Sequence, residues 1–581
     1  MTPRPSLLMR ARHFMAWILA GPQEERLRKA RSRVRLAMLA FGALYGVIAV
    51  SLVLYVVRYD RSAQSGVRSA EAVSAARPDI LDRNGAVLAT DIRTISLYAE
   101  PKKLAASFDV DEATELLTAV LPDLDAREVR ERLRSGKGFV WLRREITPAQ
   151  RDQIHRLGIP GVGFLREAKR SYPNGPTISH VLGMVNVDNQ GLGGIERYID
   201  SQGLAELHRA GLVADRNQAA VQLSIDLRVQ HVLRDELVQA HQKFRAKAAA
   251  GVIVDVNTGE ILALASIPDY DPNRPATAAG FDRANRITTG VYEMGSVMKS
   301  LTTAMALDSG RFTINSTLDA RFPMAVGRHQ VKDFHAQRRV LTLPEVFTYS
   351  SNIGTSRMAL TLGGDHQRAF LRRLGQFDRV VTEIGPSTAP LVPRRWPDIT
   401  AATVSFGHGL SVAPLQAVMG TAALVNGGRL ITPTFLRRTP EQAAAVAQQV
   451  IRPETSNAMR FLMRLNSERG SGRRAEVDGF YVGGKTGTSE KVIGGRYSKD
   501  KQLNSFMAIF PADQPRYLLL VMLDEPRGIP ETHGLATAGF NAAPTAGRVI
   551  ARSAPLLGLQ PRFDMPPAMQ AIQTGYRMPG R

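Results

Sequence analysis

The sequence predicts a mixed α+β protein whose larger domain is built on an antiparallel sheet. Two β-rich apolar runs flank a turn between residues 251 and 266, and three more strand-like runs lie at 480–488, 505–510 and 517–523. The chain between these two groups has a largely helical pattern, and an alanine-rich helix is expected at 537–551. A hairpin, a helical insert, a meander and a terminal helix are typical of an α+β domain.

Composition narrows the class of protein. With 581 residues, of which 44% are hydrophobic, the chain is long enough for two or more packed domains. The net charge of +22 favours an anionic neighbour, which could be nucleic acid, a membrane surface or a polyanionic wall. The basic residues are spread along the chain without a nucleic-acid-binding signature, so we expect no nucleic-acid partner. The lack of cysteine excludes disulfides, thiolate metal sites and a cysteine nucleophile.

The N-terminal segment has the pattern of a single membrane anchor. Residues 36–57 contain no charged side chain, and a span needs about 20 apolar residues. By the positive-inside rule, the basic arm at 1–35 stays in the cytoplasm and the chain after the span is exported. The alternative, a cleaved signal peptide, has a shorter apolar core of about 7–15 residues. The basic residues of the arm set the topology or, alternatively, contact anionic lipid: Arg4, Arg10, Arg12, Arg26, Arg28, Lys29, Arg31, Arg33 and Arg35.

Residues 58–222 are expected to form a pedestal domain. After a polar stalk at 59–76, Asn84-Gly85 lies between two short strand-like runs, which is a strong hairpin signal. Short amphipathic helices are expected at 111–121, 127–133 and 148–157. This segment holds no cluster of catalytic residue types, so we interpret it as a spacer that raises the second domain above the membrane.

The second domain is expected at 223–555 and is followed by a tail at 556–581. The run LSIDLRVQ leads into a helix that ends near Gln242. Further helices are expected from Ser296 to about Gly310, after Pro344, and over 355–362, before a glycine pair. Turns at 494–495 and 513–515 would connect the last three strands as an antiparallel meander.

The start of the helix at Ser296 holds a candidate nucleophile and base. Ser296 and Lys299 are three residues apart, so they lie on the same helix face. A hydroxyl needs a base at neutral pH, and a lysine can serve when burial or a neighbouring cation lowers its pKa. Alone, the pair also fits a solvated helix face. A second pair, Ser498 and Lys501, is excluded as a nucleophile because it is expected in a polar loop with no helix behind it.

Two more motifs complete a constellation. In Ser350-Ser351-Asn352, at an expected helix break, the hydroxyl could relay a proton and the amide could hold a peptide carbonyl. Lys485-Thr486-Gly487-Thr488 is expected to present a cation and two hydroxyls on one face of a strand, which suits a carboxylate. Gly487 would let a backbone pair with an extended substrate. The order of the three motifs is that of penicillin-binding proteins and class A β-lactamases.

Other types of site are excluded by their context. The run GFYVGGKT at 479–486 formally matches a phosphate-binding loop, but its first residues are strand formers and a turn follows where that loop requires a helix. The segment is also expected to be exported, where ATP is scarce. The GxSxG motif of serine hydrolases and the HExxH motif of zinc enzymes are absent. We therefore expect neither a cofactor nor a metal.

The chain resembles the class B penicillin-binding proteins, most closely their division-specific D,D-transpeptidases (the FtsI group). The likeness covers nearly everything after the cytoplasmic arm and lies in ILDRNGAVLAT, RSYPNG, HVLGMVNVDNQGLGGIE, SIDLRVQ, IVDVNTGEILALAS, NRITTGVYEMGSVMKS, YSSNIGTS, SFGHGLSVAPLQ, GGKTGTS and TAGFNAAPTAGRV. It implies a pedestal of the dimerisation type. It also implies a transpeptidase domain with a five-stranded antiparallel sheet flanked by helices, plus an all-helical subdomain.

The resemblance implies the chemistry. Ser296 would attack the penultimate D-Ala carbonyl of a peptidoglycan stem peptide, and the terminal D-Ala would leave. An amine of a neighbouring stem would then resolve the acyl-enzyme into a crosslink. Lys299 would act as the base on Ser296, and Ser350 would relay the proton toward the leaving amine. β-Lactams would acylate Ser296 by imitating the D-Ala-D-Ala end.

The resemblance also implies the binding residues. Asn352 would hold the substrate amide. The terminal carboxylate would be held by Lys485, Thr486 and Thr488, next to Gly487. Backbone N–H groups of Ser296 and Thr488 would form the oxyanion hole.

Some features depart from the commonest family pattern. Met294 stands where many relatives have proline before the Gly-Ser pair, and Ser300 replaces the proline that usually follows the lysine. Neither residue carries chemistry, so these changes bear only on the rigidity of the start of the helix. No glutamate can be assigned as a deacylating base, which, with the large pedestal, argues against a β-lactamase. No glycosyltransferase domain is visible before the transpeptidase, so glycan polymerisation is expected to fall to a membrane partner of the FtsW type.

The expected location is the bacterial inner membrane, with a cytoplasmic N-terminus, a periplasmic catalytic domain and a place at the division septum. Other divisome membrane proteins are expected partners. Two alternatives remain: an elongation-specific class B transpeptidase, and a non-catalytic scaffold or β-lactam sensor. A sensor should carry a large cytoplasmic or multi-span signalling region, whereas the sequence shows one arm and one span.

Overall fold

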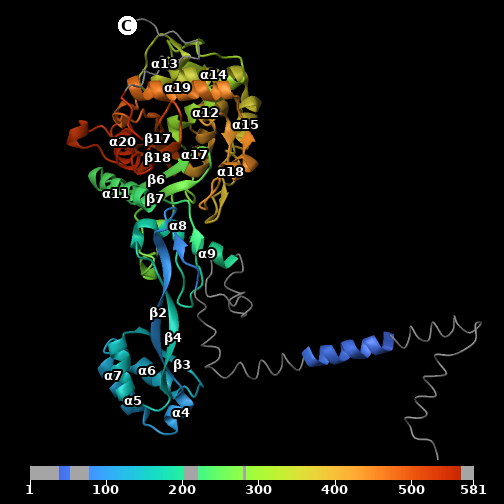
Figure 1. The fold of residues 1–581 in the computed structure, drawn as a ribbon. Helices are drawn as coiled ribbons and strands as arrows, with labels where there is room; N and C mark the ends of the chain where they lie inside the picture. The colour runs from blue at the N-terminus through green and yellow to red at the C-terminus, as the bar shows by residue number, and fades with distance from the viewer. Residues whose placement is uncertain (1–37, 53–76, 202–219, 279, 281–282, 564–581) are drawn as a thin grey trace, which may run out of the picture. The chain divides into compact units, whose positions relative to one another are not determined.

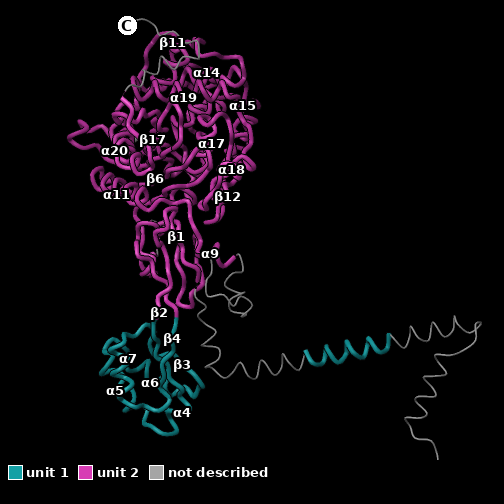
Figure 2. Tube along the Cα trace, viewed as in Figure 1, with its two compact units in different colours: residues 1–74, 94–167 teal, residues 75–93, 168–581 magenta. Residues whose placement is uncertain are grey.

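The computed structural model describes residues 38–52, 77–201, 220–278, 280 and 283–563. The chain divides into two compact units, one of residues 1–74 and 94–167 and the other of residues 75–93 and 168–581 (Figure 2). Two long strands, β2 (Val87–Ala99) and β4 (Val162–Ser171), contribute residues to both units.

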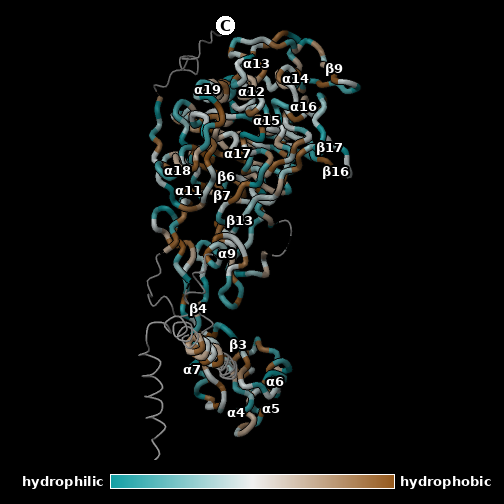
Figure 3. The backbone as a smooth tube through the Cα atoms, turned by 90° about the vertical axis from the view of Figure 1, so that its right-hand side faces the viewer, coloured by the Kyte–Doolittle hydropathy of each residue, from teal (hydrophilic) through white to brown (hydrophobic). Residues whose placement is uncertain are grey.

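Residues 38–52 form a helix inside the predicted membrane segment 36–57. Its large apolar side chains are exposed, among them Phe41, Tyr45 and Ile48, and Figure 3 colours most of this helix toward the hydrophobic end of the scale. Within the described ranges, no helix is both long and apolar enough to cross a membrane. The arm at 1–35, residues 36–37 and 53–57, the stalk at 59–76 and the end of the tail at 564–581 lie outside the described residues.

The first unit packs short helices onto one end of a sheet (Figure 1). β3 (Val140–Ile146) pairs antiparallel with β2, and β4 also pairs with β2. The helices expected at 111–121, 127–133 and 148–157 are confirmed, and a short helix precedes them: α4 (Pro101–Ala105), α5 (Val110–Val120), α6 (Ala126–Arg134) and α7 (Pro148–Arg156). Each of the last three begins at a side-chain cap: Asp109, Asp125 and Thr147. Their apolar faces form a core of this unit's own around Leu97, Leu117, Leu133 and Ile154.

The predicted hairpin at Asn84-Gly85 is confirmed, because β1 (Ile80–Leu81) pairs antiparallel with β2. β2 is much longer than the sequence predicts, since it continues to Ala99. β5 (Val221–Gln222) adds to β1 in parallel. The short helices of this part are η2 (Gly175–Ile178), α8 (Ser179–Leu182) and α9 (Gly194–Ser201).

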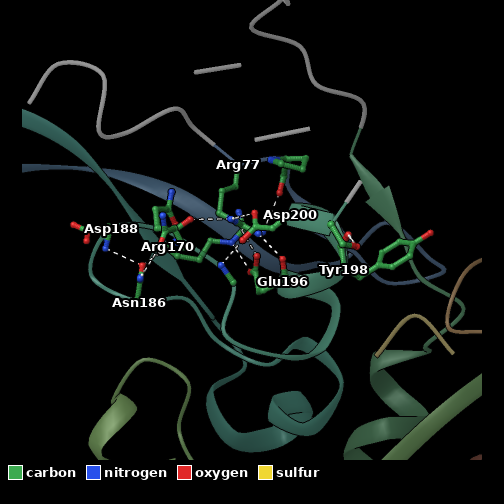
Figure 4. Close-up of polar contacts among 12 residues, drawn as sticks. Arg77, Arg170, Asn186, Asp188, Glu196, Tyr198 and Asp200 are labelled. Carbon is green, nitrogen blue, oxygen red and sulfur yellow. Dashed lines mark hydrogen bonds and ion pairs between the residues drawn. The ribbon is translucent and has the colours of Figure 1, made fainter. Parts of the chain in front are cut away.

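A buried ionic cluster joins these elements (Figure 4). Glu196 of α9 accepts from Arg77 Nε at 2.8 Å and from Arg170 Nε of β4 at 2.7 Å, and all three side chains are at most 3% exposed. Arg77 also donates to Asp200 at 2.6 Å, and Arg170 donates to Asp91 of β2 at 3.1 Å. We call these five residues the Glu196 cluster.

The larger sheet of the second unit has the strand order β16-β17-β18-β6-β7, and every pair in it is antiparallel. The hairpin predicted at 251–266 forms β6 (Ala248–Asp255) and β7 (Ile261–Ile267). The predicted meander forms β16 (Gly483–Ile493), β17 (Arg496–Phe510) and β18 (Tyr517–Asp524).

Both faces of this sheet are covered. Alternate strand residues such as Ile253, Phe506 and Val521 pack in one core with α11 (Leu227–Lys243) and α20 (Ala542–Ser553). Their neighbours, such as Val252 and Met507, pack in the other core with α12 (Met298–Asp308) and further helices. Burial on both faces explains why these strands are continuously apolar in sequence rather than alternating.

The remaining elements form a largely helical part on the α12 side of the sheet (Figure 1). Its helices are α13 (Leu343–Thr348), α14 (Asn352–Leu362), α15 (Gly364–Arg373), α16 (Asp398–Ser405), α17 (Pro414–Ala423), α18 (Pro440–Val446) and α19 (Pro453–Arg469). Its short strands are β8 (Thr317–Asp319), β9 (Met324–Val326), β10 (His329–Val331), β11 (Val340–Thr342), β12 (Val381–Thr382), β13 (Gly385–Pro386), β14 (Arg429–Leu430) and β15 (Gln448–Gln449). Pro344 lies in the first turn of α13, as predicted.

Two expected boundaries and one expected loop are wrong. The strand expected from Phe480 begins at Gly483, because Gly479 and Tyr481 have positive φ angles (84° and 50°) that interrupt an extended backbone. The helix expected from 537 begins at Ala542, where the Asn541 side chain accepts from the first backbone N–H. Ser498 lies in β17 rather than in a polar loop, since β16 and β17 continue beyond the body of the sheet.

Candidate active site

Ser296 lies at a sharp turn that precedes α12. It is the middle residue of a 3-10 turn, η5 (Gly295–Val297), and it is half-buried between two buried neighbours. Gly295 has a φ of 54°, and a Cβ there would lie 3.0 Å from the carbonyl oxygen of Thr488, so glycine suits both the conformation and the close approach. The helix predicted to start at Ser296 therefore starts as a 3-10 turn and becomes α-helical at Met298.

Two lysines meet at the hydroxyl of Ser350. Lys299, in the first turn of α12, donates to Ser350 Oγ at 3.0 Å and also to the Ser350 carbonyl oxygen. Lys485, on β16, donates to the same Oγ at 3.0 Å. Ser350 has a φ of 57°, which turns its side chain at the break between α13 and α14. The structure thus brings together one residue from each of the three predicted motifs.

The environment lowers the pKa of both amines. The pKa of Lys299 lies well below its usual value because of burial and, secondly, the charge of Lys485, while Asp333 opposes the shift. Burial lowers the pKa of Lys485 to about 7. Two like charges that share one buried hydroxyl favour the neutral form of at least one amine. An amine that is neutral near pH 7 can accept a proton, which the sequence argument required of Lys299.

The turn Ser350-Ser351-Asn352 is held by a residue that the sequence did not reveal. Asp333 accepts from Ser351 Oγ at 2.7 Å and from the backbone N–H of Ile353 at 2.9 Å. Asn352 Nδ2 donates to the carbonyl oxygen of Lys332 at 3.0 Å. The segment after β10 therefore fixes the start of α14. No local pattern marks Asp333, because its partners lie 18 and 20 residues away.

The arrangement expected for the third motif, with the cation and both hydroxyls on one face, is wrong. Lys485 is opposite Met507 in the sheet, on the α12 side, whereas Thr486 is opposite Phe506, on the α20 side. Thr486 Oγ1 is hydrogen-bonded to Ser471 Oγ at 2.6 Å, and Thr488 Oγ1 accepts from the backbone N–H of Ala538 at 3.1 Å. The reason is the two-residue period of a strand, which places consecutive side chains on opposite faces.

Gly487 has a packing role that the sequence did not show. A Cβ at this position would lie 2.5 Å from Ser505 Oγ and 2.7 Å from the carbonyl oxygen of Met294. The turn before Ser296 therefore packs directly on β16. Pairing of a substrate backbone at Gly487 stays a prediction.

Two alternatives to the three motifs, a phosphate-binding loop at 479–486 and a nucleophile at Ser498, do not fit the structure. The GFYVGGKT run leads into β16, whereas a phosphate-binding loop opens a helix. Lys501 contacts Glu525 at 3.8 Å, and Ser498 is paired with Lys491 in the sheet. Across the described ranges, no group of three or more His, Asp or Glu residues is placed to hold a metal ion.

Comparison with known proteins gives the same domain order. A family model described as the penicillin binding protein transpeptidase domain matches residues 249–551, and one described as the penicillin-binding protein dimerisation domain matches residues 72–202. The "Probable peptidoglycan D,D-transpeptidase FtsI" of Caulobacter vibrioides is 40% identical over 556 residues, which cover 94% of this chain and 91% of that protein. The "Peptidoglycan D,D-transpeptidase FtsI" of Escherichia coli is 31% identical, with 84% of this chain and 85% of that protein covered.

A solved structure shares the fold. The peptidoglycan synthetase of Bifidobacterium adolescentis superposes with a TM-score of 0.66 over 85% of this chain and 98% of that chain, at 22% identity. The resemblance stated from the sequence motifs is thus confirmed at the level of the whole chain. The chain belongs to the class B penicillin-binding proteins, in the FtsI group of peptidoglycan D,D-transpeptidases.

Proposed function

We propose that this protein is a peptidoglycan D,D-transpeptidase that crosslinks stem peptides at the division septum through an acyl-enzyme on Ser296. One observation carries the proposal: Lys299, one turn after Ser296, and Lys485 both donate to Ser350 Oγ at 3.0 Å. This geometry suits a serine nucleophile with a lysine base and a hydroxyl relay. Relatives that are named as D,D-transpeptidases, and that match this chain over most of their length, support the same activity.

The acylation step follows from these contacts. Neutral Lys299 accepts the proton of Ser296, and the serine oxygen forms a bond to the carbonyl carbon of the penultimate D-Ala. The proton passes through Ser350 to the nitrogen of the terminal D-Ala, which leaves as the amine when the peptide bond breaks. An amine of a second stem peptide then attacks the ester carbonyl carbon and forms the new peptide bond. Its proton passes to Lys299 and on to the Ser296 oxygen, which leaves as the hydroxyl when the ester bond breaks. The backbone N–H groups of Ser296 and Thr488 would stabilise the oxyanion in both halves.

Substrate binding is assigned to the other predicted residues. We assign the terminal carboxylate to the free edge of β16, where the charge of Lys485 would attract it from one face of the strand and Thr486 and Thr488 would donate from the other. Thr488 Oγ1 accepts from Ala538, so its own proton is available to a ligand. Asn352 would hold the amide of the donor stem. β-Lactams would enter the same site and acylate Ser296.

The domain plan is proposed with the boundaries expected from the sequence. It comprises a cytoplasmic arm at 1–35, a transmembrane helix at 36–57, a pedestal at 58–222, a transpeptidase domain at 223–555 and a tail at 556–581. The exposed apolar surface of the helix at 38–52 supports an anchor in the inner membrane, with the catalytic domain in the periplasm. Glycan polymerisation by an FtsW-type partner, with other divisome membrane proteins nearby, belongs to this proposal.

The test is labelling of the detergent-solubilised chain with a fluorescent penicillin. The wild type should acquire one covalent label that mass spectrometry maps to Ser296, and Ser296→Ala should acquire none. Equal labelling of the two proteins would refute the proposed nucleophile. A tagged copy that lies along the side wall instead of at midcell would favour the elongation-specific relative.

A further inference from the structure

The turn before Ser296 contains no proline that would restrict its backbone. Met294 has 1% of its surface exposed, and Ser300 is fully buried. Neither side chain restricts its own φ angle as proline does. Because an active serine must be held within about 0.5 Å of its reactive position, another contact has to fix this turn.

Backbone contacts fix only part of the turn. Tyr292 exchanges two hydrogen bonds with Val412, at 2.9 and 3.0 Å. Ser489 Oγ, on β16, donates to the carbonyl oxygen of Glu293 at 2.7 Å. Nearer to the nucleophile, the bond from Gly295 N–H to the carbonyl oxygen of Gly407 is 3.3 Å long and therefore weak.

The side chain of Glu293 supplies the missing connection. Its Oε1 accepts from the backbone N–H of Gly409 at 2.8 Å and from the hydroxyl of Tyr497 at 3.2 Å. Gly409 belongs to the segment between α16 and α17, and Tyr497 belongs to β17, so one carboxylate ties two separate parts of the domain to a point three residues before Ser296.

The groups around Glu293 suit a carboxylate that accepts hydrogen bonds. The pKa of Tyr497 is raised to about 12, first by burial and then by Glu293, so its hydroxyl keeps the proton that it donates. The pKa of His408, whose ring centroid lies 5.5 Å from that of Tyr497, is lowered to about 4, chiefly by burial. This imidazole is neutral near pH 7, so it adds no competing positive charge.

The burial of the Glu293 carboxylate costs free energy, and a positioning role would account for that cost. Glu293 Oε2 is buried and has no hydrogen-bond partner among the described residues, and burial raises the pKa of this side chain. An unsatisfied buried polar atom calls for an explanation in a folded protein. Replacing a buried, incompletely paired charge by a well-packed apolar side chain is often neutral or stabilising, so stability alone does not explain this carboxylate.

We propose that Glu293 is a positioning residue for Ser296, which holds the Gly295–Ser296 turn against the Gly409 segment and the β16–β17 hairpin. The inference rests on the proposed function, because it assumes that Ser296 is acylated. Glu293 acts through the turn and does not touch the substrate. Its loss should therefore slow the acylation step and leave the preceding non-covalent binding unchanged.

The experiment measures the acylation of the full chain in detergent by stopped flow over a range of penicillin concentrations. The saturating rate reports the chemical step, and the concentration for half saturation reports non-covalent binding. The variants are Glu293→Ala, Glu293→Gln and Tyr497→Phe. Asp500→Ala is the matched control, because Asp500 is an exposed carboxylate on the same hairpin and is not among the groups that act on Glu293 or Tyr497.

We expect Glu293→Ala to lower the saturating rate about 10- to 100-fold, the worth of hydrogen bonds to a charged group, with half saturation unchanged within about twofold. Glu293→Gln keeps an oxygen for both donors, so its rate should fall no more than about threefold. Tyr497→Phe should lower the rate about three- to tenfold, and the control should not change it.

Three results would overturn the proposal: a wild-type rate in Glu293→Ala, an equal loss in the alanine and glutamine variants, or a loss that lies wholly in half saturation. If Glu293→Ala fails to fold, Tyr497→Phe decides, since it removes one hydroxyl from a side chain that is 48% exposed. Failure of the proposed function is seen separately, as a wild type that takes no label at Ser296.

Discussion

Ser350 is the residue on which the proposed chemistry depends, because its hydroxyl receives hydrogen bonds from both lysines. Lys299 and Lys485 repel each other when both are charged, and their burial adds to the cost of charge. A neutral Lys299 beside a charged Lys485 relieves the repulsion. The same division gives one amine the role of base and the other the role of carboxylate partner.

This division of roles predicts a bell-shaped pH dependence. Acylation by a penicillin should rise with pH as Lys299 loses its proton. It should fall again as Lys485, with a pKa of about 7, loses the charge that binds the penicillin carboxylate. Lys485→Arg keeps a positive charge to far higher pH, so the alkaline fall should vanish even if the maximal rate is lower. The measurement is the apparent second-order acylation rate between pH 5 and pH 9. An unchanged alkaline fall in the variant would contradict the assignment.

Asp333 provides a second prediction at the scale of one residue. Asp333→Asn removes the negative charge that raises the pKa of Lys299 and replaces an acceptor for Ser351 with an amide donor. We expect the acylation rate to fall about tenfold and the free energy of unfolding to fall by about 1–3 kcal/mol, because one buried hydrogen bond is lost. Asp365→Asn, in the first turn of α15, is the control and should change neither quantity by much. Equal rates in the two variants would show that Asp333 does not support the turn.

At the scale of elements, the sequence predicted what depends on local pattern. The hairpin at 251–266, the meander and the helices of the first unit are present, because turn residues, caps and apolar periodicity act over a few positions. Lys299, Ser350 and Lys485 were found because their motifs are ordered along the chain. Glu293 was not, since its partners Gly409 and Tyr497 are 116 and 204 residues away. The sequence argument placed the Thr486 side chain on the same strand face as Lys485, which is wrong because consecutive residues of a strand point to opposite faces.

The Glu196 cluster gives a prediction about stability at the scale of structural elements. Glu196 is the shared partner of two buried guanidinium groups, so Glu196→Gln leaves excess positive charge inside the protein. Removing one member of a buried ion pair costs about 3–5 kcal/mol, which chemical denaturation should show. Glu128→Gln, in the exposed Glu128–Arg132 pair of α6, should cost no more than about 1 kcal/mol. If the two variants lost similar stability, the cluster would be no more than an ordinary surface network.

At the scale of the whole molecule, the two units have separate cores. The buried residues of the first core lie between Leu97 and Ile159, and none of them belongs to the two cores that line the sheet of the second unit. The residues proposed to be catalytic, Ser296, Lys299 and Ser350, all belong to the second unit. We therefore expect the chemistry at Ser296 to be independent of the folding of residues 94–167.

Deletion of that segment tests this independence. Thr94 Oγ1 donates to the carbonyl oxygen of Glu167 at 3.4 Å, and Arg170 donates to Asp91 at 3.1 Å, so β2 and β4 run antiparallel at this point. An Asn-Gly turn can therefore join Arg93 to Ala168 as a tight hairpin. The shortened chain should fold, lose one calorimetric transition and acylate Ser296 within about threefold of the wild-type rate, because no residue of either core that lines the sheet of the second unit is removed. A shortened chain that folds but takes no penicillin label would show that the first unit controls the site. Loss of all cooperative unfolding would show that the two cores are not independent.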